Sequence, residues 1–275
     1  MKLKQYLVIA VCAITGVTLW VLPRTALSAK SATQPTVQHL SAVEDQIELL
    51  KKELSPDALT RLDFYENNLK KALSPQEKAG WYDSLGIYWD KQMRPGIAAE
   101  YVYMRASITQ TPADWLRAGK RFLGLSGFFN QEEKTMLAGR AVECLEKAYT
   151  SDSLNQEVQT NLGVAYTQSG ENPMRGITLL KKITEKDPAN FEAQFNLGLF
   201  SMQSGQYDKA VGRFRTAIQL RGDLPELRLY LSDALSGAGM QQEARKELLD
   251  LKKLTRDSIL QSEADRRLQQ LKNSF

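Results

Sequence analysis

The arrangement of apolar and small residues repeats along the second half of the chain with a period of about 34 residues. In each copy a leucine precedes a small residue, and the three leucines are spaced 35 and then 34 residues apart. These pairs are Leu162 and Gly163, Leu197 and Gly198, and Leu231 and Ser232. A small residue beside a large one marks a point where two helices touch. This period predicts an all-α solenoid of stacked helix pairs, in which no pair buries its apolar face alone.

Each copy continues with a turn and a second helix. The turns hold Gly170, Gly205 and Gly239. The second helix places a small and a large apolar residue on one stripe, Ala210 with Phe214 and then Ala244 with Leu248. This pattern resembles the tetratricopeptide repeat family, whose consensus runs Leu-Gly, two residues and Tyr, then Ala, three residues and Phe, and a closing Pro. The resemblance implies a right-handed superhelical solenoid of antiparallel helix pairs.

Two poorer copies precede the three clear ones. The first uses Tyr82, Leu85, Gly86, Trp89, Ala98 and Val102. The second begins with Trp115, Ala118, Gly119 and Phe122 and returns at Ala141, Leu145 and Ala148. It fits only if about ten extra residues lengthen the helix pair. We expect Asn130 and Glu133 to form a capping box there, and Phe128 and Phe129 to stand at a protruding tip.

The resemblance thus covers residues 79–258 as five repeats, at 79–111, 112–155, 156–190, 191–224 and 225–258. Several residues depart from the family pattern. Gln159, Gln194 and Arg228 stand where the family usually has a large aromatic residue, and Gly176 replaces the small alanine. The tyrosine position holds Tyr166, Ser201 and Leu235 in the last three repeats. We expect these departures to weaken individual helix contacts without removing the repeat.

The amino-terminal segment is directed to a membrane. Residues 6–22 carry no charge, and they are preceded by Lys2 and Lys4 and closed by Pro23 and Arg24. This length fits either a short anchoring helix within residues 1–29 or a signal peptide cleaved after Ser28. In both cases the positive amino end favours the cytoplasm, which puts the repeats on the extracytoplasmic side, in a periplasm-like space. A lipid-modified Cys12 fits the sequence poorly.

The repeats are flanked by elements of other composition. Residues 30–39 are rich in Ser, Thr, Gln and Pro and predict a flexible tether. Residues 40–78 predict a helical hairpin that caps the array, with Ser41 and Glu44 as a capping box and Ser55 before Pro56 starting its second helix. Residues 259–275 predict a capping helix with one apolar stripe.

Charge and composition offer little chemistry. The formal net charge of +4 includes three basic residues and no acid within residues 1–29, so the remainder carries +1 and lacks the clustered basic face of a nucleic-acid binder. The one histidine, His39, lies in the predicted tether, and Cys144 has no intramolecular disulfide partner outside the leader. We therefore expect no catalytic residue, no metal site and no cofactor.

Binding remains, and the resemblance implies where. In that family, defined positions of each first helix line a concave groove that takes extended peptides or helices. Carried over, these positions give a groove strip of Leu116, Lys120, Val164, Phe195, Leu199, Met202 and Leu229. Asp83, Ile87, Thr160 and Asp233 occupy further such positions. The lysine, asparagine and arginine set with which one family subgroup grips acidic chaperone tails is absent.

We therefore expect a non-catalytic protein-protein interaction scaffold, membrane-tethered or exported, whose groove strip binds an apolar or amphipathic segment of a partner protein. An equal reading is that neighbouring helices or the chain's own ends cover these side chains. The alternative function is a self-assembling structural subunit of an envelope complex, a homo-oligomer in which Phe128 and Phe129 dock into another copy.

Overall fold

The computed structural model describes residues 34–125 and 130–272, and every regular element in these ranges is an α-helix. The helices are α2 (Gln34–Lys51), α3 (Pro56–Lys71), α4 (Pro75–Lys91), α5 (Pro95–Thr109), α6 (Pro112–Leu125), α7 (Gln131–Ser151), α8 (Gln156–Ser169), α9 (Pro173–Lys186), α10 (Phe191–Gln203), α11 (Tyr207–Leu220), α12 (Leu227–Gly237), α13 (Gln241–Leu254) and α14 (Ser258–Lys272). The chain divides at Ser55 into two compact units, of which the first contains α2 and the second contains α3 to α14.

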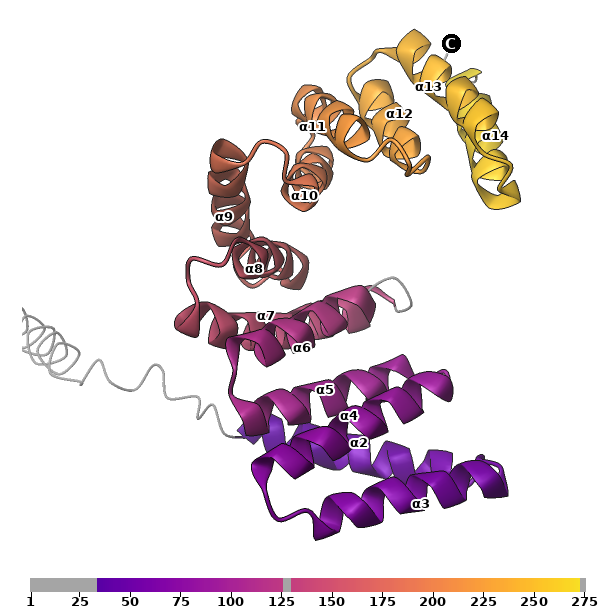
Figure 1. Cartoon of the computed structure of the whole chain (residues 1–275). Coiled ribbons are helices and arrows are strands. Elements are labelled where there is room, and N and C mark those ends of the chain that lie inside the picture. Colours follow the sequence, from indigo (N-terminus) through magenta and orange to yellow (C-terminus); the bar gives the residue numbers. More distant parts are fainter. Residues whose placement is uncertain (1–33, 126–129, 273–275) are drawn as a thin grey trace, which may run out of the picture. The chain divides into compact units, whose positions relative to one another are not determined.

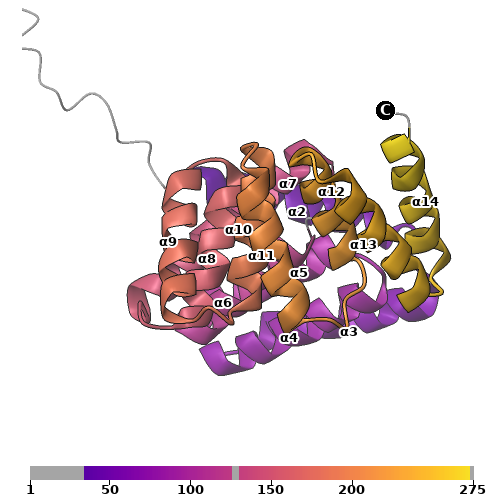
Figure 2. The same ribbon diagram turned by 90° about the horizontal axis from the view of Figure 1, so that it is seen from above.

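Within the second unit each helix packs mainly on its neighbours in the chain (Figure 1). The closest partners include α4 with α5, α6 with α7, α8 with α9, and α10 with α11, and Figure 2 shows α8 to α11 standing side by side. Contact mainly between neighbours is the mark of a solenoid, so the predicted all-α architecture is confirmed for these residues.

The Leu-Gly positions bring the two helices of a pair together. A Cβ atom added at Gly198 of α10 would lie 2.7 Å from the Phe214 ring of α11. At the equivalent place in α8, a Cβ on Gly163 would lie 2.9 Å from the Leu180 side chain of α9. Because these distances leave no room for a side chain, glycine is required at both crossings. The predicted helix register is therefore confirmed.

Three glycines end the first helices as the sequence predicts. Gly170, Gly205 and Gly239 have φ angles of 71°, 70° and 78°, in the left-handed region that favours glycine. Each turn reverses the chain and sends the second helix back along the first.

The second repeat is lengthened, as its spacing predicts. Helix α7 has 21 residues, whereas α9 and α11 have 14 each. Asn130 caps α7: its side-chain oxygen accepts a 3.0 Å hydrogen bond from the Glu133 N–H, and the Glu133 carboxylate accepts one of 3.0 Å from the Asn130 N–H. The predicted capping box is confirmed. Phe128 and Phe129, predicted at the tip, lie outside the described residues.

The predicted flexible tether over residues 30–39 is wrong from Gln34 onward, where α2 begins. Pro35 falls in the first turn of α2, where its missing N–H would have had no intrahelical partner, so it does not stop the helix. The predicted capping box of Ser41 and Glu44 is wrong as well, because both residues lie inside α2. The first repeat also starts earlier than residue 79, since Ser74 caps α4 at Pro75.

Residues 1–33 lie outside the described part of the chain, and with them the predicted leader and its charge-free segment 6–22. Among the helices of residues 34–125 and 130–272, none combines the length and the apolar character that crossing a membrane requires.

Candidate functional site

The residues of the groove strip differ in how far they reach solvent. Val164 and Leu229 are buried, with 9% and 8% of their surfaces exposed. Leu116 of α6 is half-buried against the apolar core of the second repeat. In α10, Phe195, Leu199 and Met202 are half-buried against the core of the last two repeats, with one side open. Three of the four half-buried apolar residues of the strip therefore lie on α10.

An aromatic cluster holds the α10 part of the strip in place. The Phe195 ring lies edge-on to Tyr230 of α12 at 5.2 Å between centroids and 6.0 Å from the buried Phe214. Phe191, one helical turn earlier, stacks on Phe195 at 5.9 Å. Such ring pairs stabilise by about 0.5–1.5 kcal/mol beyond their burial. The Phe195 side chain is thus pre-ordered before any ligand arrives.

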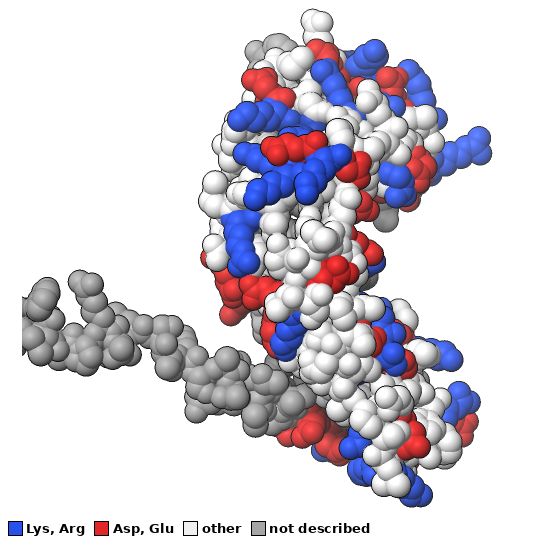
Figure 3. Space-filling view, turned by 60° about the vertical axis from the view of Figure 1, so that its left-hand side comes forward, with Lys and Arg blue, Asp and Glu red and all other residues white. Residues whose placement is uncertain are grey.

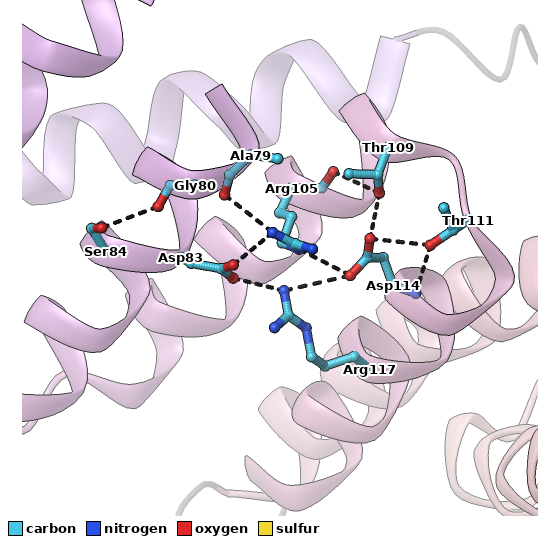
Figure 4. Close-up of polar contacts among 9 residues, drawn as sticks. All are labelled: Ala79, Gly80, Asp83, Ser84, Arg105, Thr109, Thr111, Asp114 and Arg117. Carbon is cyan, nitrogen blue, oxygen red and sulfur yellow. Dashed lines mark hydrogen bonds and ion pairs between the residues drawn. The ribbon is translucent and has the colours of Figure 1, made fainter. Parts of the chain in front are cut away.

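At the amino-terminal end, the groove position of the first repeat belongs to an ion-pair network (Figure 4). The Asp83 carboxylate of α4 accepts hydrogen bonds from Arg105 of α5 at 2.6 Å and from Arg117 of α6 at 2.7 Å. Arg105 also donates to Asp114 of α6 at 2.9 Å. Since the network joins three helices of two repeats, Asp83 has its partners within the chain.

Asp114 connects this network to the start of α6. Its backbone N–H donates to the Thr111 hydroxyl at 3.1 Å, and its carboxylate accepts hydrogen bonds from Thr109 at 2.6 Å and from Thr111 at 3.1 Å (Figure 4). Burial alone would raise the pKa of the Asp114 carboxyl, but the hydrogen bonds from Thr109, Arg105 and Thr111 outweigh it and lower the pKa. The carboxylate is therefore a structural anion.

Other charged groove positions are paired in the same way. Lys120 of α6, a member of the groove strip, lies 2.5 Å from the Glu157 carboxylate of α8. Asp233 of α12 accepts two hydrogen bonds from Arg267 of α14, at 2.7 and 3.0 Å. Charged residues at groove positions thus join neighbouring helices, and the half-buried apolar residues of α10 are the part of the strip left to face a partner.

A second concave feature lies between α9, α10 and α11. It is a cleft of about 790 Å³. Its apolar wall consists of Pro173, Met174, Ile177, Leu197 and Phe200. Met174 is 68% exposed at the rim of the cleft. The cleft uses the α10 face that carries Leu197, whereas the groove strip uses the α10 face that carries Leu199.

The repeat register explains why this cleft exists. We call the place where α8 contacts the return helices α7 and α9 the closed seam, and the equivalent place among α9, α10 and α11 the open seam. In the closed seam the family's tyrosine position holds Tyr166, which is 2% exposed. In the open seam the same position holds Ser201, which lines the cleft. A hydroxymethyl group replaces an aromatic ring, and the space remains unfilled.

The charges at the two seams differ as well. In the closed seam the Tyr166 hydroxyl donates to Glu146 of α7, and Arg175 of α9 lies 3.3 Å from the Glu146 carboxylate. Arg175 also covers the Tyr166 ring at 4.7 Å. The same register positions in the open seam hold Lys181 in place of Glu146 and Lys209 in place of Arg175. The open seam therefore lacks the tyrosine ring and the carboxylate that fill the closed seam.

Basic residues gather on this face of the molecule (Figure 3), so the expectation that the repeats lack a clustered basic face is wrong here. Helices α9 and α11 together hold seven basic and two acidic residues. Figure 3 shows basic side chains gathered over α9 and α11, with an acidic side chain among them. Lys181, Lys209 and Arg213 line the cleft, and its described lining contains no carboxylate. Lys209 donates to Gln206 at 2.6 Å and Arg213 to Gln194 at 2.6 Å, both neutral acceptors. Burial lowers the pKa of the Arg213 guanidinium.

The repeat pattern alone does not predict this cleft. Its signal was present, because Gln194 and Ser201 depart from the repeat consensus at the two positions where large aromatic residues are usual. What was missing was the link between these departures on α10 and the lysines on α9 and α11, which belong to different helices.

The described residues offer little for metal or thiol chemistry. Across 34–125 and 130–272 there is no group of three or more His, Cys, Asp or Glu side chains placed to hold a metal ion. Cys144 is fully buried, and burial raises its pKa to about 12. The thiol is therefore protonated at neutral pH and poorly reactive.

Comparisons with known proteins agree with the repeat architecture. Residues 179–212 match the family model described as tetratricopeptide repeat. A thermophilic tetratricopeptide repeat protein of Thermus thermophilus is similar in structure, with a TM-score of 0.52 and 19% identity over 69% of this chain and 98% of that one. MamA of Desulfovibrio magneticus, from residue 41 to its end, has a TM-score of 0.51 and 16% identity over 66% of this chain and 97% of that one. No curated protein matches by sequence. These findings support a tetratricopeptide repeat fold.

Proposed function

We propose that the protein is a non-catalytic scaffold for protein-protein interaction, and that the part of its groove strip on α10 binds an apolar or amphipathic segment of a partner protein. Solenoids of stacked helix pairs present extended surfaces that suit such binding. Three apolar side chains of α10, Phe195, Leu199 and Met202, provide the contact surface.

The observation that carries this proposal is the contrast along the strip. Charged groove positions such as Asp83, Lys120 and Asp233 are paired with neighbouring helices. Phe195 is pre-ordered by its contacts with Phe214 and Tyr230 and keeps one side open. An ordered aromatic anchor loses little side-chain entropy on binding, which favours it as the centre of an interface.

We further propose that residues 6–22 bring the protein to a membrane, either as a retained anchor or as a cleaved signal, and that the repeats face the extracytoplasmic side. The charge-free segment and the basic residues Lys2 and Lys4 before it support this orientation. The partner then lies in the same compartment.

Capture of partners from the membrane fraction tests the proposal. Leu199→Ser and Met202→Ser remove two open anchors while leaving Phe195 and its ring contacts in place. We expect the combined variant to capture at least about tenfold less partner than the wild type, because each lost side chain contributes about 1.5 kcal/mol or more to binding.

Leu154→Ser is the matched control, because Leu154 is 89% exposed and lies outside the groove strip. It should capture as much partner as the wild type. Unchanged capture by a combined Leu199 and Met202 variant that retains its helical circular dichroism signal would overturn the proposal.

A further inference from the structure

The open seam lacks two groups that the closed seam contains, and a ligand that supplies both would fit it. At the same register positions where the closed seam holds a tyrosine ring and a carboxylate, the open seam holds Ser201 and Lys181. The cleft of about 790 Å³ has an apolar wall and three cationic side chains, and its described lining contains no carboxylate to balance them.

We propose that this cleft binds an acidic segment of a partner protein, which inserts an aromatic or large apolar side chain beside Ser201 and places a carboxylate between Lys181 and Lys209. The inserted ring takes the place that Tyr166 fills in the closed seam. The carboxylate takes the place of Glu146. The site lies on the other face of α10 from the groove strip, so it is a second binding surface and does not depend on the function proposed for the strip.

The hydrogen-bond partners of two of the cationic side chains leave their charges available to an acidic ligand. Arg213 is partly buried and donates to the Gln194 amide oxygen. Its position beside an apolar wall strengthens an ion pair with an incoming carboxylate, because the local dielectric is lower than in water. Lys209 donates to Gln206, another neutral acceptor. A segment with a net negative charge is therefore favoured and a basic one is repelled.

The helices around the open seam are also packed less closely than those around the closed seam. Helices α9 and α10 contact each other much less extensively than α7 and α8 do at the equivalent place in the closed seam. Met174 extends over the cleft with most of its side chain in water. A ligand that fills the cleft covers this side chain and joins α9 to α11, as Tyr166 and its partners join α7 to α9.

The experiment uses the full chain and a fluorescein-labelled peptide with one tyrosine flanked by glutamates in a glycine-serine background. One companion peptide has alanine for the tyrosine, and another has glutamine for the glutamates. Binding is measured by fluorescence anisotropy up to about 1 mM peptide, so that dissociation constants in the micromolar range are well determined. We expect binding of the acidic tyrosine peptide and at least about tenfold weaker binding of both companions.

Variants then locate the binding site. Ser201→Tyr fills the cleft from within, and Lys181→Glu places the carboxylate of the closed seam in the open one; each should weaken binding at least about tenfold. Lys182→Glu is the matched control, with the same charge change on the same helix at an exposed residue that does not line the cleft. It should stay within about threefold of the wild type. Thermal melts check that every variant is folded.

Three results would overturn the proposal. The first is a wild type that binds the acidic tyrosine peptide no better than the glutamine companion, or not at all. The second is a folded Ser201→Tyr variant that binds as the wild type does. The third is a wild-type dimer in sedimentation that Ser201→Tyr dissociates, because the cleft would then hold a second copy of this chain.

Discussion

The closed and open seams share one backbone plan and differ at several side chains, three of which decide whether the space is filled and how it is charged. Around α8, Tyr166, Glu146 and Arg175 fill the space among three helices and satisfy one another. Around α10, Ser201, Lys181 and Lys209 occupy the same register positions and leave a cleft. In a repeat protein, the contacts within a helix pair can therefore be kept while the contacts between pairs diverge. The Leu-Gly crossing is similarly tight in both repeats, while only one seam is filled.

The largest expected effect comes from opening the closed seam. Tyr166→Ser removes a buried ring and leaves a cavity, so we expect it to lower the free energy of unfolding by about 3–5 kcal/mol in urea titrations. Ser201→Ala, the change at the equivalent residue, should stay within about 0.5 kcal/mol, because the Ser201 hydroxyl donates to Leu197 of its own helix. Equal effects of the two substitutions would remove the distinction between the seams.

The contact between α10 and α11 within the fourth repeat should not tolerate a larger side chain, although the neighbouring seam is open. Gly198→Leu forces atoms into the space that the Phe214 ring occupies, 2.7 Å from a Cβ at this position. We expect a loss of about 1–3 kcal/mol, visible as a lower midpoint of thermal unfolding. A neutral result would show that α10 and α11 cross with more freedom than their geometry indicates.

Filling the open seam should stabilise the protein. Ser201→Tyr places a ring against Leu197 and Phe200 in a cleft large enough to accept it. The gain expected from cavity filling is about 0.5–2 kcal/mol, measured by urea titration. A destabilised variant would mean that the cleft does not correspond to the tyrosine pocket of the closed seam.

The smallest expected effect is a loss of stability at alkaline pH, and it comes from the closed seam. Burial raises the pKa of Tyr166, and the hydrogen bond to Glu146 raises it further. The neutral phenol therefore stabilises the fold at pH below about 10 and loses that contribution as the pH rises through the folded-state pKa. At about pH 8, Tyr166→Phe should cost about 0.5–1.5 kcal/mol for the lost hydrogen bond. The difference from the wild type should shrink at about pH 11, and a constant difference would contradict this origin.

Local signals in the sequence predicted much of the fold. The turn glycines, the Leu-Gly crossings and the Asn130 capping box each depend on a few neighbouring residues, and all three are confirmed. A local signal also gave a wrong prediction at α2, where Ser41 resembles a cap although the helix starts before it. A serine can cap a helix only where the residues before it are not helical. Here the preceding residues are already part of α2, so Ser41 lies inside the helix.

The sites were less predictable because they combine separate repeats. The register placed Leu229 and Val164 in the groove strip, yet packing between repeats buries both. Asp83 finds its partners on α5 and α6, more than twenty residues away in the chain. The cleft needs Ser201 on α10 and lysines on two other helices. A single sequence shows which residues depart from the repeat pattern. It does not show which of these residues lie next to one another in the fold.

A double-mutant cycle tests most directly the claim that the open seam is a closed seam without its ring and carboxylate. Ser201→Tyr and Lys181→Glu are made singly and together, and the free energy of unfolding is measured in urea. If the seams are equivalent, the tyrosine hydroxyl donates to the new carboxylate as Tyr166 does to Glu146, and the pair is more stable than the sum of the single changes by about 0.5–1.5 kcal/mol. A coupling free energy of zero, or one that destabilises the pair, would contradict the account.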